Sequence, residues 1–355
     1  MRKAKQIPLA ASAATSLAKE QCSSSETAHY KAQLVESLCE ERHLMADLTG
    51  GLGVDFSALA PLFERAVYVE RNADLCTLAC RNFADGLNSG RVCVVEGDGI
   101  SVIESRKPED APLSLLYLDP ARRDGAGRRV SAISDCQPDA AMYAPRLVQA
   151  ADTVMVKLSP MLDITLAVSQ LRYVSEVHAV SLGRECKELL FVLRRDADGA
   201  NPLVVAADAA GAYPPFSFRQ SEEAAAEARI APQVGKYLYE PSPAVMKAGA
   251  FKLMSSRFEV DKLHPNTHLY TSDAYVADFP GRRFEVMSVF GFSKADVRTL
   301  KAAVEGRANV AVRNFPGSAE DVRRRLKVKD GGQHYVFATT LSDGRHLLVD
   351  CLKAG

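Results

Sequence analysis

Short apolar runs recur along residues 43–158, and each gap between them is long enough to hold a helix. The runs are HLMAD (43–47), AVYVE (66–70), VCVVE (92–96), LLYLD (115–119) and TVMVKL (153–158). Continuous apolar runs are typical of strands buried on both faces, and their alternation with helices requires right-handed crossovers and a parallel sheet. The pattern predicts an α/β fold with a doubly wound, Rossmann-like sheet.

Two further runs, EVHAVSL (176–182) and LLFVLRR (189–195), are separated by only six residues, GRECKE. Six residues cannot hold a crossover helix, so this pair is predicted to form an antiparallel hairpin at the sheet edge. Ahead of the first run, Ser23 stands three residues before Glu26. This spacing predicts a capping box and an amphipathic helix over 23–42.

Gly, Ala and Pro crowd residues 197–215, which is typical of an interdomain region. The segments FEVMSVFG, SKADVRTLKAAV, ANVAVRNF, SAEDVRRRLK, HYVFATTL and HLLVDCL then predict strand, helix, strand, helix, strand, strand. We therefore predict four regions. They are an N-terminal helical segment over 1–42, the α/β domain over 43–196, a connecting segment over 197–240 and a smaller α+β binding module over 241–355.

The charge of the chain is zero overall but unevenly distributed. Residues 241–355 carry a net charge of +6, and residues 1–240 carry −6. Lys and Arg that neutralise phosphates dominate the affinity for nucleic acids, so a polyanion is expected to bind the C-terminal module. An ordinary solvated surface is the alternative explanation of this charge.

The eight cysteines include no CxxC pair and show no metal-ligand spacing with histidine. This usage argues against a disulfide scaffold and against a zinc site, so we expect a cytoplasmic protein without a metal. The apolar stretches are shorter than the ~20 residues of a membrane span, and the alanine-rich N-terminus lacks the apolar region of a secretory signal. We expect no membrane partner.

Acidic residues stand at the ends of successive predicted strands, at Asp47, Glu70, Asp98 and Asp119. The carboxyl edge of an open α/β sheet is where ligands bind. The glycines of DLTGGLGVD (47–55) let the backbone turn sharply and let a ligand approach it closely. We expect a nucleoside pocket at this edge; the alternative is that the acids only cap the following helices.

Two nucleoside ligands fit such a pocket, a dinucleotide or S-adenosylmethionine. If Gly51 and Gly53 are the first two glycines of a dinucleotide fingerprint, Phe56 takes the third position, where a small residue is required. Because S-adenosylmethionine has no pyrophosphate, it makes no such demand. Together with the predicted final hairpin, this favours methyl transfer.

These motifs resemble the class I S-adenosylmethionine-dependent methyltransferases, specifically bacterial members with a C-terminal THUMP-like domain. The resemblance covers nearly the whole chain, with EQCSSSETAHYKA, DLTGGLGVD, YVERN, EGDGI, YLDPARRD, VKLSPMLDI and CKELLF in the first part and GKYLYEPSPAVMKAGAF, KLHPNTHLYTSD and KVKDGGQHYVFAT in the second. It implies S-adenosylmethionine as cofactor, a methyltransferase domain over 43–196 and a THUMP-like RNA-binding domain over 241–355. The cofactor contacts that it implies are Asp47, Thr49, Gly51, Gly53, Glu70, Asn72, Asp98 and Gly99.

The turn LDPARRDGAGRR (118–129) follows the fourth apolar run, where class I enzymes place the methyl acceptor. Amino-group methyltransferases have Asp or Asn, two prolines and an aromatic residue there. Asp119 and Pro120 match this turn, whereas Ala121 and Arg122 do not, so stacking on a base would fall to the Arg122 guanidinium. The same turn is similar to that of some uridine C5-methyltransferases, which need a cysteine after the fifth strand, where this chain has Lys157 and no cysteine.

A nitrogen or a hydroxyl is therefore the expected acceptor. Asp119 would orient the amine, the Pro120 carbonyl would take a second proton contact, and Lys157 would contact a phosphate. The alternative for Lys157 is a salt bridge to Asp119. RNA contacts are predicted on two basic stretches, at Arg123, Arg128 and Arg129 and at Arg324, Lys327 and Lys329.

The function that fits these features best is methylation of a base nitrogen in rRNA or tRNA. Two alternatives stay open: a catalytically silent RNA-binding protein that keeps the methyltransferase fold, and a small-molecule methyltransferase. The first is favoured by the missing aromatic residue in the 118–129 turn, and the second leaves the basic module unexplained. No feature of the sequence indicates an oligomeric state.

Overall fold

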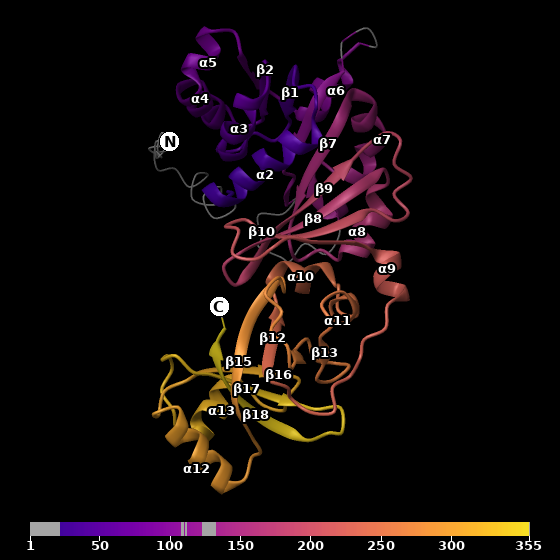
Figure 1. Cartoon of the computed structure of the whole chain (residues 1–355). Helices are drawn as coiled ribbons and strands as arrows, with labels where there is room; N and C mark the ends of the chain where they lie inside the picture. Colours follow the sequence, from indigo (N-terminus) through magenta and orange to yellow (C-terminus); the bar gives the residue numbers. More distant parts are fainter. Residues whose placement is uncertain (1–21, 108–109, 111, 123–132, 355) are drawn as a thin grey trace. The chain divides into compact units, whose positions relative to one another are not determined.

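The computed structural model describes residues 22–107, 110, 112–122 and 133–354, which are coloured along the chain in Figure 1. The chain divides into two compact units between Val205 and Ala206. A nine-stranded sheet organises the first part of the chain, and a seven-stranded sheet organises the second.

The five apolar runs of 43–158 form the parallel part of the nine-stranded sheet, as predicted, with the third run at the sheet edge. The strands are β1 (Leu44–Asp47), β2 (Arg65–Glu70), β3 (Val92–Glu96), β4 (Leu113–Leu118) and β7 (Ala151–Leu158). β1 pairs in parallel with β2 and β4, and these pair in parallel with β3 and β7. All six residues of β4 are buried, which explains why its sequence is a continuous apolar run.

The final hairpin is antiparallel, but it does not lie at the sheet edge. β8 (Val174–Leu182) pairs with β9 (Glu185–Leu193), which pairs antiparallel with β7. The strand order is β11-β10-β8-β9-β7-β4-β1-β2-β3, where β10 is Leu203–Asp208 and β11 is Phe216–Arg219. The edge prediction was wrong because LVVAAD, with Val204 and Ala206 buried, lies within a stretch whose glycines and prolines suggested a linker.

Helices connect the strands and begin at short polar caps. They are α2 (Ser25–Leu38), α3 (Val54–Leu59), η1 (Ala60–Leu62), α4 (Ala73–Asn82), α5 (Ala84–Asn88), α6 (Gly99–Glu104), η2 (Ile133–Asp135), α7 (Ala140–Ala150) and α8 (Ile164–Leu171). The caps of four of them accept hydrogen bonds from the first turn of the helix, at Asn72, Asp98, Asp139 and Asp163. A two-stranded ribbon, β5 (Ala121–Arg122) with β6 (Cys136–Gln137), follows β4.

The cap of α2 lies one residue later than predicted. Ser24 has extended backbone angles and accepts a hydrogen bond from the Thr27 amide, so it, and not Ser23, is the N-cap. The capping box with Glu26 was therefore wrong. The capping-box spacing favoured Ser23 because Glu26 follows it by three residues, whereas Thr27 follows Ser24. The Ser23 hydroxyl instead donates to Asp55, 32 residues away.

The second unit contains the predicted order of strand, helix, strand, helix, strand, strand. These elements are β15 (Gly281–Phe290), α12 (Lys294–Ala303), β16 (Asn309–Arg313), α13 (Ala319–Leu326), β17 (Tyr335–Thr340) and β18 (His346–Lys353). Before them come α9 (Gln220–Ala225), β12 (Tyr237–Pro241), α10 (Pro243–Ala248), α11 (Leu253–Arg257), β13 (Asp261–Lys262) and β14 (Tyr270–Ser272). The seven strands have the order β13-β14-β12-β15-β18-β17-β16.

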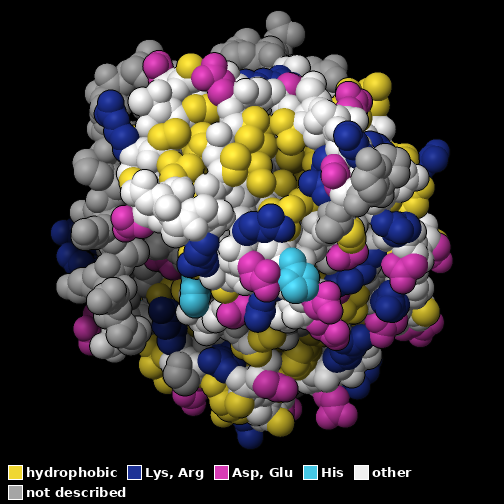
Figure 2. All heavy atoms as spheres, turned by 90° about the horizontal axis from the view of Figure 1, so that it is seen from above, with side chains coloured by type: hydrophobic (Ala, Val, Ile, Leu, Met, Phe, Trp, Pro, Cys, Tyr) yellow, Lys and Arg dark blue, Asp and Glu magenta, His cyan; other side chains and the backbone are white. Residues whose placement is uncertain are grey.

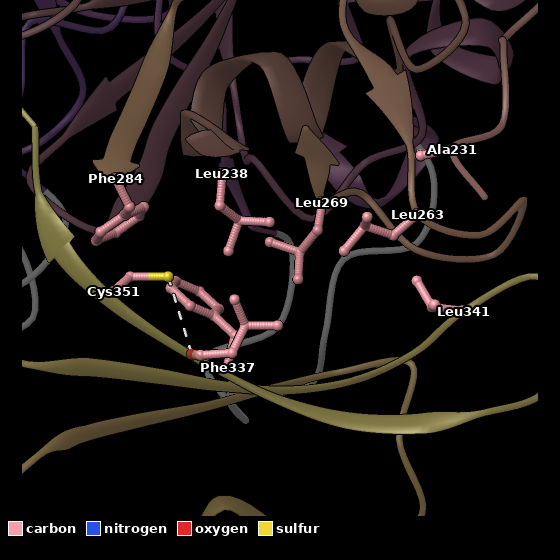
Figure 3. Close-up of a cluster of buried hydrophobic side chains, with 9 residues drawn as sticks. Ala231, Leu238, Leu263, Leu269, Phe284, Phe337, Leu341 and Cys351 are labelled. Carbon is pink, nitrogen blue, oxygen red and sulfur yellow. Dashed lines mark hydrogen bonds between the residues drawn. The ribbon is translucent and has the colours of Figure 1, made fainter. Parts of the chain in front are cut away.

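The seven-stranded sheet buries apolar side chains in two clusters. Figure 3 shows one of them, in which Phe284, Phe337 and Cys351 from β15, β17 and β18 point toward Leu238 and Leu269. The other cluster joins α12 and α13 to the sheet, and its members are Leu300, Val304, Ala308, Val322, Leu326, Val328, Val336, Ala338 and Leu348. The second unit therefore has its own core, as an independently folded domain requires. Among all the described helices, none has the length and apolar character to cross a membrane.

Ser24→Ala should lower the free energy of unfolding of the first unit by about 1 kcal/mol, because the Thr27 amide loses its acceptor. The matched control is Ser25→Ala, whose exposed hydroxyl contacts Glu26. We expect the control to change stability by no more than a few tenths of a kcal/mol, since exposed positions away from caps are tolerant. Urea denaturation followed by circular dichroism measures both, and equal losses would contradict the assignment of Ser24 as the cap.

Candidate functional site

A pocket of about 690 Å³ opens at the carboxyl ends of β1 to β4 and β7. Acids predicted at four strand ends line it together, at Asp47, Glu70, Asp98 and Asp119. Thr49, Gly51, Gly53, Gly99, Pro120 and Lys157 also line this pocket. The structure thus brings together most of the predicted site residues of the first unit, and it does so because parallel strands present their carboxyl ends at one edge.

The turn after β1 depends on glycine at three positions. Gly51 and Gly53 have left-handed backbone angles, with φ of +54° and +75°, and a Cβ at Gly50 would lie 2.2 Å from the Tyr68 ring. The Gly51 amide donates to Glu70 Oε2 at 2.9 Å, and the Tyr68 hydroxyl donates to the Gly51 carbonyl. The sequence prediction missed Gly50 and Tyr68, whose role arises from contact between two strand ends.

Asp47 and Thr49 join the end of β1 to the end of β4. Asp47 accepts from the Thr49 amide at 3.0 Å, and the Asp119 amide donates to the Thr49 hydroxyl at 2.6 Å. Asp47 is buried, and this burial raises its pKa to about 8, assisted by the neighbouring carboxylates of Asp55 and Asp119. The Asp47 side chain therefore holds the turn rather than extending into solvent.

The acids after β2 and β3 differ in what they contact. Glu70 accepts from the amides of Gly51 and Asn72, so it fixes the glycine turn and the start of α4. Asp98 caps α6 by accepting from the Ser101 amide at 2.9 Å, and its other oxygen pairs with Arg71. The helix-capping alternative therefore describes Asp98, although Asp98 also lines the pocket.

Asn72 and Gly99 have roles that the local backbone explains. The Asn72 side chain accepts from the amides of Asp74 and Leu75 as the N-cap of α4, and Asn72 is not among the residues that line the pocket. A Cβ at Gly99 would lie 2.3 Å from the Leu48 carbonyl oxygen. Glycine at 99 is therefore required for the close packing of α6 against the end of β1.

Lys157 forms the salt bridge that was the alternative to a phosphate contact. Its ammonium lies 2.5 Å from Asp119 Oδ2 and 3.4 Å from Asp55 Oδ2. Burial of Lys157 would lower its pKa, but the carboxylates of Asp119 and Asp55 outweigh burial and raise the pKa above its ordinary value. Lys157 is therefore charged and held by acids at the inner end of the pocket.

Four residues that the sequence prediction missed surround this pair, namely Ser23, Lys31, Asp55 and Glu188. Lys31 is completely buried in α2, with its ammonium 2.6 Å from Glu188 and 3.2 Å from Asp55. A signal for it exists in the sequence, because Lys31 lies three residues after Ala28 and four before Val35, both on the buried face of the helix. A lysine at such a position requires a buried acid as partner.

Two cysteines, Cys22 and Cys136, also line the pocket. The sequence prediction looked for a catalytic cysteine only in the segment after the fifth strand, and that segment contains no cysteine. Arg122 is the last residue of β5, and its backbone pairs with that of Cys136 in β6. The side chain of Arg122, together with Arg123, Arg128 and Arg129, lies outside the part of the chain that the structure describes.

The basic residues predicted in the second unit are exposed around the end of α13. Arg324, Lys327 and Lys329 are all exposed, and Arg324 has an ion pair with Asp321 at 3.3 Å. Arg323 pairs with Glu320 and Asp330. Arg325 lies over the ring of Phe292 and donates to its carbonyl. The three consecutive arginines thus point in different directions, as the helical periodicity requires.

Comparisons with known proteins agree with this geometry. A model of a ferredoxin-like domain matches residues 237–280, and a model described as THUMP domain-like matches residues 281–353. These models divide the module that the sequence prediction treated as one. They also place its beginning close to β12.

The chain is similar over most of its length to a crystal structure of a candidate methyltransferase from Porphyromonas gingivalis W83. The sequences are 36% identical, the match covers 96% of this chain and 83% of that one, and the TM-score is 0.86. Uncharacterised S-adenosylmethionine-dependent methyltransferases from two strains of Mycobacterium tuberculosis, CDC 1551 and H37Rv, are each 24% identical over 84% of this chain and 77% of their own length. The chain belongs to the S-adenosylmethionine-dependent methyltransferases that carry a THUMP-like domain at the C-terminus.

Proposed function

We propose that the protein methylates a nitrogen of a base in RNA, either rRNA or tRNA, and that Asp119 receives the acceptor amine. The observation that carries this proposal is the position of the Asp119 carboxylate. Its Oδ2 is fixed by Lys157, while 36% of the side chain stays exposed where it lines the pocket. A carboxylate held in this way can orient an amine, and orientation supplies most of the rate in such a transfer.

The turn after β1 supports the cofactor half of the proposal. At Gly51, a Cβ would have only the Thr49 carbonyl within 4 Å, so the backbone is open to a ligand there. Glu70 lies beside this turn, where it would bind the ribose hydroxyls. Asp98 and Gly99 line the same pocket, where they would contact the adenine. S-adenosylmethionine supplies the methyl group from its sulfonium, and the protein's residues hold and orient both reactants.

The charge of the C-terminal module over 241–355 supports RNA as the acceptor. Residues 241–355 carry +6, and the THUMP-like match covers most of them. Figure 2 shows one face of the molecule, on which Lys and Arg are interspersed with Asp and Glu around an apolar area. Such mixing is typical of an ordinary solvated surface. We place the RNA contact at Arg324, Lys327 and Lys329, because these basic side chains are exposed.

A uridine C5 acceptor is the second candidate, because Cys136 and Cys22 line the pocket that holds Asp119. C5 is nucleophilic only after a thiolate adds to the ring, so one of these cysteines would have to attack it. A nitrogen acceptor needs no such nucleophile. The two chemistries therefore differ in their dependence on cysteine.

Glu70→Ala should weaken binding of S-adenosylhomocysteine by about 1 to 3 kcal/mol, the usual cost of losing a charged hydrogen-bond partner. The matched control is Glu96→Ala at the end of the neighbouring β3, an exposed residue that does not line the pocket. Isothermal titration calorimetry measures both affinities. Wild-type protein should be stabilised against heat by S-adenosylhomocysteine and not by NAD. Equal losses of affinity for S-adenosylhomocysteine in the two variants would contradict the assignment of Glu70 to the cofactor site.

Asp119→Ala should abolish methyl transfer and leave the affinity for S-adenosylhomocysteine within a few-fold, because Asp119 is assigned to the acceptor and not to the adenosine. The assay is mass-spectrometric analysis of RNA nucleosides from cells lacking the protein, complemented with wild type or variant. One methylated nucleoside should be lost in the deletion and restored by wild type alone. A deletion that leaves every RNA nucleoside unchanged would contradict the proposed function.

Cys136→Ala and Cys22→Ala are expected to restore the same nucleoside as wild type does. Each substitution removes a thiol while leaving Asp119 and Lys157 in place. Loss of activity in either variant, together with a covalent adduct on RNA that contains 5-fluorouridine, would favour the uridine C5 alternative.

Replacing Arg324, Lys327 and Lys329 together by Ala should weaken RNA binding across sequences. The salt dependence of the affinity should become shallower by about one unit of slope for each phosphate that the protein no longer neutralises. Arg229→Ala is the control, since Arg229 is an exposed cation of the same unit that is paired with Asp261. Fluorescence anisotropy with unfractionated tRNA at several salt concentrations gives the slopes. An unchanged slope in the triple variant would assign these charges to solubility.

A further inference from the structure

The most unusual group near the pocket is the ammonium of Lys31. It belongs to α2, which precedes the first strand of the sheet, and none of its side chain is exposed. It contacts Glu188 at 2.6 Å, Asp55 at 3.2 Å and the Ser23 hydroxyl at 3.1 Å. A buried charge is stable only when other groups compensate it fully, so this arrangement needs an explanation beyond packing.

Lys31 is the second member of a chain of alternating charges that ends at the acceptor site. The order of the groups is Glu188, Lys31, Asp55, Lys157 and Asp119. In this series of charges the Asp55 carboxylate lies between the two ammonium groups, and each ammonium lies between two carboxylates. The four elements α2, α3, β7 and β9 contribute one member each, and the last follows β4.

Asp55 joins the two halves of the chain. Its Oδ1 faces Lys31, and its Oδ2 accepts from Lys157 at 3.4 Å and from the Tyr117 hydroxyl at 2.7 Å. Ser23 completes the junction, since its hydroxyl donates to Asp55 at 2.9 Å and accepts from both ammonium groups. A change at Lys31 therefore reaches Lys157 through groups in direct contact.

We propose that Lys31 is a positioning residue for methyl transfer: by neutralising Asp55 and Glu188 it holds Lys157 against Asp119 and keeps the Asp119 carboxylate ionised for the acceptor amine. This inference rests on the role of Asp119 in the proposed function. Without Lys31, a single ammonium at Lys157 would face three carboxylates. It would be shared among them, and Asp119 would be neutralised less completely.

The electrostatics around Asp119 agree with this role. Burial raises the pKa of Asp119, and the Lys157 ammonium opposes this increase. The ammonium groups of Lys31 and Lys157 together hold the pKa of Asp55 below its ordinary value despite burial. The charged and titratable groups that face Asp119 from the elements around it are Lys157, Asp55, Lys31, Asp47 and Tyr117. Removing Lys31 leaves Lys157 as the one cation among these described groups.

A purely structural role for Lys31, as an anchor of α2, predicts a different result. The same helix has a second polar anchor, because the Tyr30 hydroxyl lies 2.8 Å from His178 Nδ1 of β8. Tyr30 is adjacent to Lys31 in sequence, but its hydroxyl forms no hydrogen bond with any of the five described charged groups. Tyr30→Phe is therefore a matched control that removes one anchor of the helix and leaves all five charged groups in place.

The experiment is a pH titration of the Asp119 side chain by NMR, using full-length protein with aspartate labelled by ¹³C at the side-chain carboxyl. The Asp119 signal is identified by its loss in Asp119→Asn. In Lys31→Met the midpoint should rise by about one pH unit, because loss of a nearby opposite charge favours the neutral acid. Tyr30→Phe should leave the midpoint unchanged. An unchanged midpoint in Lys31→Met, or an equal rise in both variants, would overturn the proposal.

Two further variants keep the test decisive if Lys31→Met does not fold. Glu188→Gln removes a negative charge and keeps Lys31 paired with Asp55, so the Asp119 midpoint should fall or stay constant. The double variant Lys31→Met, Glu188→Gln restores the charge balance, and its midpoint should return toward that of wild type. A rise in Glu188→Gln would contradict the alternating chain.

Methyl transfer to RNA from cells lacking the protein gives the functional readout. A carboxylate that must be ionised loses activity as the pH falls through its pKa, so the acidic limb of the rate profile should move upward in Lys31→Met by the same amount as the NMR midpoint. If wild type transfers no methyl group to RNA, the proposed function fails. The NMR titration still decides the role of Lys31 in that case.

Discussion

The need to keep charges paired out of water is the constraint on which the pocket depends. Lys31, Asp55, Lys157 and Glu188 are all less than 10% exposed. Taking one ion out of water costs several kcal/mol even after relaxation, and removal of one partner leaves the other uncompensated. The pocket can therefore form only when α2, α3, β7 and β9 are all in place. This dependence couples the helix that precedes the sheet to β7 and β9, which come more than 100 residues later in the chain.

The glycine turn after β1 meets the opposite requirement, because it must remain free of side chains. Tyr68 occupies the space beside Gly50, and the Leu48 carbonyl occupies the space beside Gly99. These contacts bring the ends of β1, β2 and the start of α6 close together. Glu70 then holds the turn through the Gly51 amide. The part of the pocket beside the glycine turn is thus shaped by backbone contacts, whereas the part beside Asp119 is shaped by buried side-chain charges.

Sequence reasoning predicted the parts of the fold that depend on local pattern. Strands buried on both faces appear as apolar runs, so β1, β2, β4 and β7 were found. The run of β3 was found as well, although β3 lies at the sheet edge and none of its residues is buried. Sequence reasoning placed the hairpin of β8 and β9 at the edge of the sheet, because it did not recognise β10 as a strand. The alanines and valines of β10 lie in a region rich in glycine and proline, which is typical of a linker. The same reasoning gave the helix cap to Ser23, because Glu26 follows Ser23 by three residues and the distant partner of Ser23, Asp55, cannot be seen from local sequence.

The site was predicted as far as residues at strand ends and no further. Acids that follow strands meet at one edge by topology alone, so the sequence is enough to place Asp47 and Asp119 together. Lys31 and Glu188 are 157 residues apart, and their contact depends on how α2 packs on β9. A buried lysine in an amphipathic helix signals that a partner exists. It does not identify that partner, because the acid lies on an element distant in sequence.

The net charge of +6 over residues 241–355 is a poor measure of the attraction for a polyanion, because several arginines of this stretch are paired with acids that precede residue 241. Glu240 binds both Arg282 and Arg313, and Arg257 pairs with Glu222. Such pairs present little field to a distant phosphate. Lys327 and Lys329, in contrast, form no ion pair with any residue in the described ranges, and both are exposed. Because α13 ends at Leu326 with Lys327 in a left-handed conformation, the chain turns there and separates these lysines from the paired arginines. The distribution of ion pairs, rather than the total charge, therefore determines where this unit can attract a polyanion.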